Sequence, residues 1–143
     1  MSLSKCVLPI DDVLGFGVRQ ILGASPQTSC KQAGNYMRTI RDTVGGDVSV
    51  ANFPTALAAW AAGDIKLGRF PNQMRKRALE LWQWCRWRAE EGVVEIDLKS
   101  VLDAKIKGLG IWCVLSMARF RCGAECWVPK DSRVRRNMLK AGL

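Results

Sequence analysis

The chain contains no histidine, only one tyrosine and no C-x-x-C pair. A zinc site would therefore have to be built from cysteines alone, and the six cysteines, at positions 6, 30, 85, 113, 122 and 126, lack the usual spacing of zinc ligands. We expect no metal site and no cofactor. We interpret the cysteines as buried thiols of a protein in a reducing compartment.

Long apolar runs are also missing. No stretch of about 18 apolar residues is present to span a membrane, and the first residues lack the basic and apolar regions of a signal peptide. We therefore expect a cytoplasmic protein that does not bind membranes. No internal repeat, low-complexity segment or linker interrupts the 143 residues, which predicts a single domain over residues 1–143.

Acidic residues are few relative to basic ones. The chain has 13 Asp and Glu against 22 Lys and Arg, a formal net charge of +9 and an isoelectric point of about 9.6. Such an excess favours a polyanionic partner, most often nucleic acid. Three basic groups are candidates for phosphate contacts, although a solvated charged face is the usual explanation for any single run. They are Arg75–Arg77, Arg119 with Arg121, and Arg133–Arg136.

The apolar periodicity is helical, and no alternating pattern of strand length is convincing. Caps and breakers, such as Pro71 before a long apolar stripe and Gly63 after a shorter one, set the expected helix ends. We predict an all-α fold, a compact bundle of about six to seven helices. Its centre would be the helix 111–122, which is apolar nearly all round. The expected helices are 11–22, 25–43 with Ser25 as N-cap, 54–62, 71–91, 98–105, 111–122 and one beginning at Asp131 or Ser132.

A glycine-containing turn, Lys107-Gly108-Leu109-Gly110, precedes the helix expected from Ile111. Glycines at alternate positions let the backbone turn with positive φ and approach another surface closely. The helix that follows would direct free N–H groups at that surface, which suits a phosphate. On these residues alone a plain helix connection is the simpler interpretation, since glycines commonly just join helices.

The segment Ile106–Cys113 resembles the L-x-G-x-G-x-x-T/S hairpin of the helix-hairpin-helix DNA glycosylase superfamily, which includes endonuclease III and the 3-methyladenine DNA glycosylases. Asp131–Arg136 is similar to the D-x-x-V-x-R segment that carries the catalytic aspartate of this family. A weaker likeness extends over residues 16–33 and 53–84. The resemblance implies that residues 98–122 form the helix-hairpin-helix motif and that the partner is double-stranded DNA.

The resemblance also implies roles for single residues. Asp131 would face the anomeric carbon of a flipped nucleotide, where it stabilises the charge that develops as the damaged base leaves or orients the attacking water. Trp112 stands where strand-cleaving members carry a lysine. Because an indole cannot form a Schiff base, the chain would excise a base without cutting the strand, and Trp112 would stack on a base such as a cationic alkylated purine. The implied DNA-binding residues are Lys107, Gly108, Leu109, Gly110, Gln27, Arg133, Arg135 and Arg136.

Simpler interpretations stand beside these roles, since Asp131 is also an ordinary helix cap and Trp112 an ordinary core residue. Complete family members build the base pocket between two helical subdomains, whereas here about ten residues precede the first predicted helix and twelve follow Asp131. We therefore expect a shortened member that contains the hairpin-bearing subdomain. Two alternatives stay open: a non-catalytic helix-hairpin-helix DNA-binding module, and an interaction protein such as a homo-oligomer whose neighbour supplies the missing walls.

Overall fold

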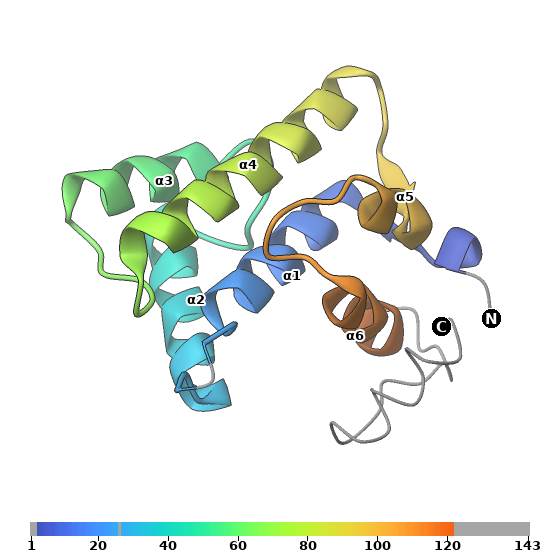
Figure 1. Cartoon of the computed structure of the whole chain (residues 1–143). Helices are drawn as coiled ribbons and strands as arrows, with labels where there is room; N and C mark the ends of the chain where they lie inside the picture. Colours follow the sequence, from blue (N-terminus) through green and yellow to red (C-terminus); the bar gives the residue numbers. More distant parts are fainter. Residues whose placement is uncertain (1–2, 26, 122–143) are drawn as a thin grey trace.

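A computed structural model describes residues 3–25 and 27–121, and this part of the chain is mostly helical (Figure 1). It contains six α-helices, one 3-10 turn (η1, Leu3–Lys5) and two strands of three residues each, so the all-α prediction is confirmed. The helices are α1 (Ile10–Leu22), α2 (Cys30–Val44), α3 (Phe53–Ala62), α4 (Pro71–Glu90), α5 (Leu98–Asp103) and α6 (Ile111–Arg121).

Helix α1 lies at the centre of the described structure. It packs against α4, α2, α6 and the first strand, and Figure 1 shows it between α2 on one side and α5 and α6 on the other. The residues that α1 buries against these elements include Leu14, Val18, Ile21 and Leu22. Helix α6 buries several side chains too, but it lies at the edge of the described part rather than at its centre as predicted (Figure 1).

Two short strands were not predicted. Strand β1 (Val7–Pro9) pairs with β2 (Glu95–Asp97) in antiparallel register, with Leu8 opposite Ile96. Both of these central side chains are buried. Strands of three residues are too short to show an alternating pattern that stands out in the sequence. This two-stranded sheet matters for the site because its hydrogen bonds hold the segment before α5 beside the segment before α1.

The start of α2 differs from the prediction. The helix begins at Cys30 and its N-cap is Ser29, whose Oγ accepts a hydrogen bond from the Gln32 N–H at 3.1 Å. That bond satisfies one of the free donors of the first turn. Ser25, the predicted cap, instead accepts from the Gln27 N–H at 3.3 Å and holds a turn in the α1–α2 loop. Both Ser25 and Ser29 are suitable N-cap residues by type, and Ser29 is the one that caps α2.

Helix α4 follows its prediction closely. Burial raises the pKa of the Cys85 thiol to about 12, with a smaller contribution from the negative charge of Asp11, so Cys85 is a neutral core residue. Two tryptophans of α4 differ in burial: Trp82 packs on the core and donates from Nε1 to the Val50 carbonyl at 2.9 Å, whereas Trp87 is 53% exposed. The buried stripe of α4 consists of Met74, Ala78, Leu81 and Cys85.

Candidate nucleic-acid interface

Residues 104–110 connect α5 to α6 by a tight turn. Helix α5 begins at a cap, because the Asp97 carboxylate accepts the Ser100 N–H at 2.9 Å. Beyond α5, Lys105 has a φ of 52° and Gly108 a φ of 93°. The positive φ at Gly108 agrees with the turn that was predicted from this glycine. At Lys105 it places a non-glycine residue in the left-handed region, which was not predicted.

Leu109 fixes this loop to the core. Its side chain is 3% exposed, and a Cβ added to Gly17 in the middle of α1 would lie 3.4 Å from Leu109 Cδ1. The same Cβ would lie only 2.5 Å from Leu81 Cδ2, so the missing side chain of Gly17 makes room for Leu81 and lets Leu109 pack against α1. Because the Leu109 side chain is buried, any contact of this residue with a ligand would have to use its backbone.

The two glycines of the loop have different surroundings. A Cβ at Gly108 would lie 2.9 Å from Ile21 Cγ1 and 3.4 Å from Arg77 Cδ, whereas a Cβ at Gly110 would have nothing within 4 Å. Gly108 thus lets the loop approach α1 and α4 closely. Gly110, directly before α6, leaves the backbone exposed at the helix start. An anion needs that kind of open access to reach the N–H groups of a helix N-terminus.

Cys113 closes the turn from the inside. Its Sγ–H donates to the Gly108 carbonyl oxygen at a donor–acceptor distance of 3.6 Å. Burial raises the pKa of this thiol, while a backbone hydrogen bond from Gly110 acts in the opposite direction. The thiol is thus a neutral donor that links the first turn of α6 to the loop, at the position where the resembling motif has Thr or Ser.

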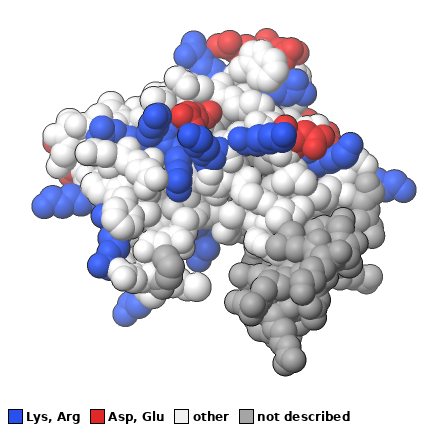
Figure 2. Space-filling model, in the orientation of Figure 1, with Lys and Arg blue, Asp and Glu red and all other residues white. Residues whose placement is uncertain are grey.

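Basic side chains of α4 stand beside the loop. Lys76 and Arg77 line a cavity of about 120 Å³ together with Lys107, Gln73 and Glu80. Figure 2 shows Lys and Arg side chains gathered across the middle of this face, with a few acidic side chains beside them. Three cations and one carboxylate give the lining of this cavity a net positive charge. We refer to Lys76, Arg77 and Lys107 as the hairpin cations.

The ion pairs of the described residues lie elsewhere. They join Arg86 to Glu90, Arg88 to Glu91 and Lys99 to Asp103. Within residues 3–25 and 27–121, none of these pairs uses a hairpin cation. The hairpin cations therefore have no ion-pair partner within these ranges and are available to an external anion.

The remaining predicted site residues fall into three groups. Trp112 is half-buried in the first turn of α6, directly after the loop, and its carbonyl accepts the Ser116 hydroxyl at 2.9 Å. Gln27 is exposed in the separate α1–α2 loop. The structure thus places Trp112 next to Lys107–Gly110 but keeps Gln27 on another segment. The others, Asp131, Arg133, Arg135 and Arg136, lie outside the described residues.

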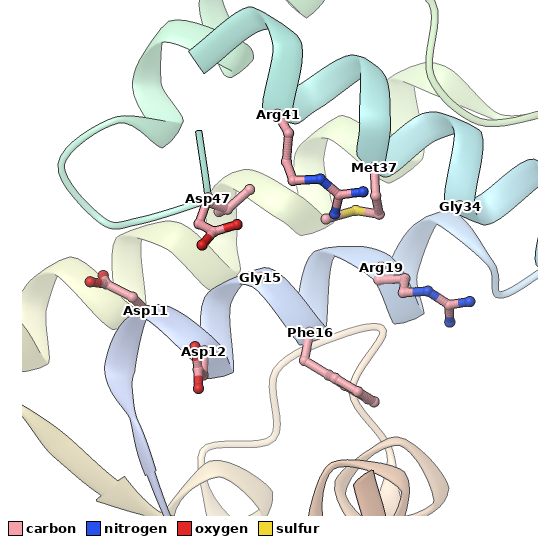
Figure 3. Close-up of a pocket in the computed structure, with 10 residues that line it drawn as sticks. Asp11, Asp12, Gly15, Phe16, Arg19, Gly34, Met37, Arg41 and Asp47 are labelled. Atoms are coloured by element: carbon pink, nitrogen blue, oxygen red, sulfur yellow. The ribbon is translucent and has the colours of Figure 1, made fainter. Parts of the chain in front are cut away.

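A second cleft, of about 340 Å³, lies between α1 and α2 (Figure 3). Asp11, Asp12 and Asp47 line it together with Arg19 and Arg41. Three carboxylates against two guanidinium groups give it a negative balance, opposite to that of the cavity at Lys107. By elementary electrostatics this cleft is the poorer place for a polyanion.

No family model, curated protein or solved structure matches this chain. Among the described residues, no helix has the length and apolarity that a membrane crossing requires. In the same part of the chain no three His, Cys, Asp or Glu side chains gather so that they could hold a metal ion. The features that bear on function are therefore the geometry around the α5–α6 loop and the sequence patterns.

Sequence reasoning identified the parts of this interface but not their arrangement. Both Lys107 and the Arg75–Arg77 run were candidates, yet nothing in the local sequence says that they adjoin. The role of Gly17 was missed because a glycine inside a helix suggests only local weakness. A helix-weakening glycine within an apolar stripe is, however, a signal that something packs closely there.

Proposed function

We propose that this chain binds duplex DNA through the α5–α6 loop and the hairpin cations. The observation that carries the proposal is that Lys107 of the loop stands beside Lys76 and Arg77 of α4, while the space beside Gly110 at the start of α6 is open. Cationic side chains and the N–H groups of a helix start are the two kinds of group that bind backbone phosphates. Such contacts give affinity that depends little on sequence and strongly on salt.

The proposal extends to base excision. The support is the resemblance of Asp131–Arg136 to a catalytic segment, together with Trp112 at the position of the strand-cleaving lysine. Trp112 is half-buried at the start of α6 and would stack on the flipped base. An alkylated purine fits best, because it is cationic and a good leaving group. Asp131 would assist hydrolysis of its N-glycosidic bond without strand cleavage. In this proposal the protein works in the cytoplasm, where thiols such as Cys6 stay reduced.

The experiment that tests excision is base release from duplex oligonucleotides carrying an alkylated purine, uracil or 8-oxoguanine. Wild-type protein and Asp131→Asn are compared on the same duplexes, and binding is measured alongside over a salt series. We expect wild-type protein to form abasic sites, and Asp131→Asn to bind equally well but release no base.

The other outcomes separate the two parts of the proposal. Salt-sensitive binding without base release by either protein would make the chain a non-catalytic DNA-binding module. Absence of both binding and release would overturn the whole proposal. Base release that persists in Asp131→Asn would leave the enzyme but remove Asp131 from its mechanism.

A further inference from the structure

A cavity of about 530 Å³ lies at the corner between the end of α3 and the start of α4. The wall includes three basic side chains, those of Lys66, Arg69 and Arg75, and no carboxylate from the described residues. Lys66 and Arg69 are exposed and Arg75 is half-buried. No ion pair within the described part of the chain occupies any of the three. The corner thus has concentrated positive charge without an internal counter-charge.

The start of α4 adds hydrogen-bond donors to the same corner. Helix α4 is 20 residues long, its N-cap residue is Phe70, and no side chain caps it by a hydrogen bond. Pro71 at the first position has no N–H, which leaves those of Asn72 and Gln73 without a partner inside the helix. Asn72 itself lines the cavity. The positive end of a long helix dipole therefore faces this space.

Trp60 provides an independent observation. Its side chain forms part of the cavity wall and is only 3% exposed. Its buried Nε1–H has no hydrogen-bond acceptor in the structure as described, in contrast to Trp82 Nε1, which donates to a backbone carbonyl. A buried donor without an acceptor is unfavourable, because it has lost its hydrogen bond to water and gained none in return. The Trp60 indole thus has an unpaired donor within the wall of this cationic cavity.

We propose that this corner is a second phosphate-binding site, formed by Lys66, Arg69, Arg75, the start of α4 and the Trp60 indole. The ligand chemistry is a phosphate group, carried either by free phosphate or by a nucleic-acid backbone. Cations and free helix N–H groups together suit an oxyanion that accepts several hydrogen bonds, and the Trp60 indole in the cavity wall would report its binding.

The cavity at this corner adjoins the cavities that the hairpin cations line. Arg75 lines it and also lines, with Lys76, a neighbouring hollow of about 390 Å³. Lys76 in turn shares the cavity of Lys107. The three hollows are therefore linked by shared side chains into one track from the α3–α4 loop to the α5–α6 loop. Occupation of the corner by a DNA backbone rests on the proposed function, whereas binding of free phosphate does not.

The first arm of the test titrates the whole chain with inorganic phosphate and follows the indole N–H resonance of Trp60 by NMR, assigned through its bonds to the ring carbons. We expect a saturable shift that weakens at least several-fold in Arg69→Gln. Arg69 is exposed, so this substitution leaves the core intact. Lys99→Gln, on α5, is the matched control and should behave as wild type.

The second arm measures duplex binding over a salt series. If the DNA backbone occupies the corner, Arg69→Gln should lower the slope of log K against log salt by about one. An unchanged slope with an intact phosphate titration would assign the site to free phosphate. A Trp60 resonance that responds to neither phosphate nor duplex would overturn the site. Failure of the proposed DNA binding would look different, because the duplex would not bind while phosphate still moved the Trp60 resonance.

Discussion

Leu109 in the α5–α6 loop packs against Gly17 in the middle of α1. A Cβ on Gly17 would stand 3.4 Å from Leu109 Cδ1 and 2.5 Å from Leu81 Cδ2, so three segments meet at this glycine. The contact explains how a loop with two glycines keeps a fixed place. It also means that the position of Lys107 depends on a residue in the first helix.

Gly17→Ala should therefore destabilise the protein. Leu81 is completely buried, and its Cδ2 would have to shift within the packed core to accept the added methyl group. Overpacking of this kind costs roughly 1–3 kcal/mol, against a gain in helix propensity of up to about 1 kcal/mol. Urea unfolding should show a net loss of stability.

Gly34→Ala in α2 is the matched control, because a Cβ there would have nothing within 4 Å. This variant should gain up to about 1 kcal/mol from helix propensity alone. Equal effects of the two substitutions would show that Gly17 is not a packing requirement.

The two loop glycines should separate stability from binding. Gly108→Ala combines a φ of 93° with a contact of 2.9 Å to Ile21, so we expect a loss of roughly 1–3 kcal/mol in unfolding free energy. Gly110→Ala has neither problem and should change stability by less than about 0.5 kcal/mol. Its methyl group would nevertheless stand where a phosphate approaches the start of α6, and duplex affinity should fall. Unchanged affinity in Gly110→Ala would mean that no phosphate sits there.

The helix framework could be predicted because its signals are local. Pro71 starts α4, and Gly63, with a φ of 82°, ends α3 where the sequence places the stop. The start of α2 was harder to predict, because two nearby residues carry nearly the same signal. Ser25 and Ser29 both suit an N-cap, and only the tertiary structure decides between them.

The interface itself was only half predictable. The glycines at 108 and 110 indicated a tight turn, and the structure has one. The approach of Arg77 to Gly108 joins residues far apart in sequence, and no local pattern encodes such a contact. Trp60 was missed for a similar reason, since an unpaired indole donor is a property of the packed structure rather than of the sequence.

The hairpin cations should determine how strongly DNA binding depends on salt. Each phosphate contact that is lost lowers the slope of log K against log salt by about one. Lys107→Gln and Lys76→Gln should each have this effect, and the double variant should approach a change of two. Lys99→Gln removes a cation that stands 3.9 Å from the Asp103 carboxylate instead, so its slope should match wild type. Equal slopes in all four variants would contradict a phosphate role for the α5–α6 loop.

The cap of α5 should make stability depend on pH in acid. Desolvation by burial opposes ionisation of Asp97, but hydrogen bonds from the Ser100 side chain and backbone outweigh it and lower the pKa of Asp97 below its usual value. A carboxylate with a lowered pKa in the folded state contributes stability that is complete above the unfolded pKa and is lost as pH falls through the folded pKa. The stability difference between wild type and Asp97→Asn should be constant near neutral pH and shrink below about pH 4.

Asp97→Ala removes the cap at every pH. Loss of an N-cap costs about 0.5–2 kcal/mol, and Asp97→Ala should show this loss in urea unfolding at pH 7. Ser100→Ala, which removes only the side-chain bond of 2.7 Å to Asp97, should lose less. If the stability difference between wild type and Asp97→Asn instead increased as the pH fell, the pKa of Asp97 could not be lowered in the folded state.

Cys113 should be replaceable by serine but not by alanine. Its Sγ–H donates to the Gly108 carbonyl from inside the turn, and a serine hydroxyl forms the same bond as a stronger donor. Cys113→Ala leaves that carbonyl without its side-chain partner and should cost about 0.5–1.5 kcal/mol. Because the bond holds Gly108 against the first turn of α6, duplex affinity should fall with it in Cys113→Ala and persist in Cys113→Ser. If alanine bound DNA as well as serine, the turn would hold its shape through the Leu109 and Gly108 contacts alone.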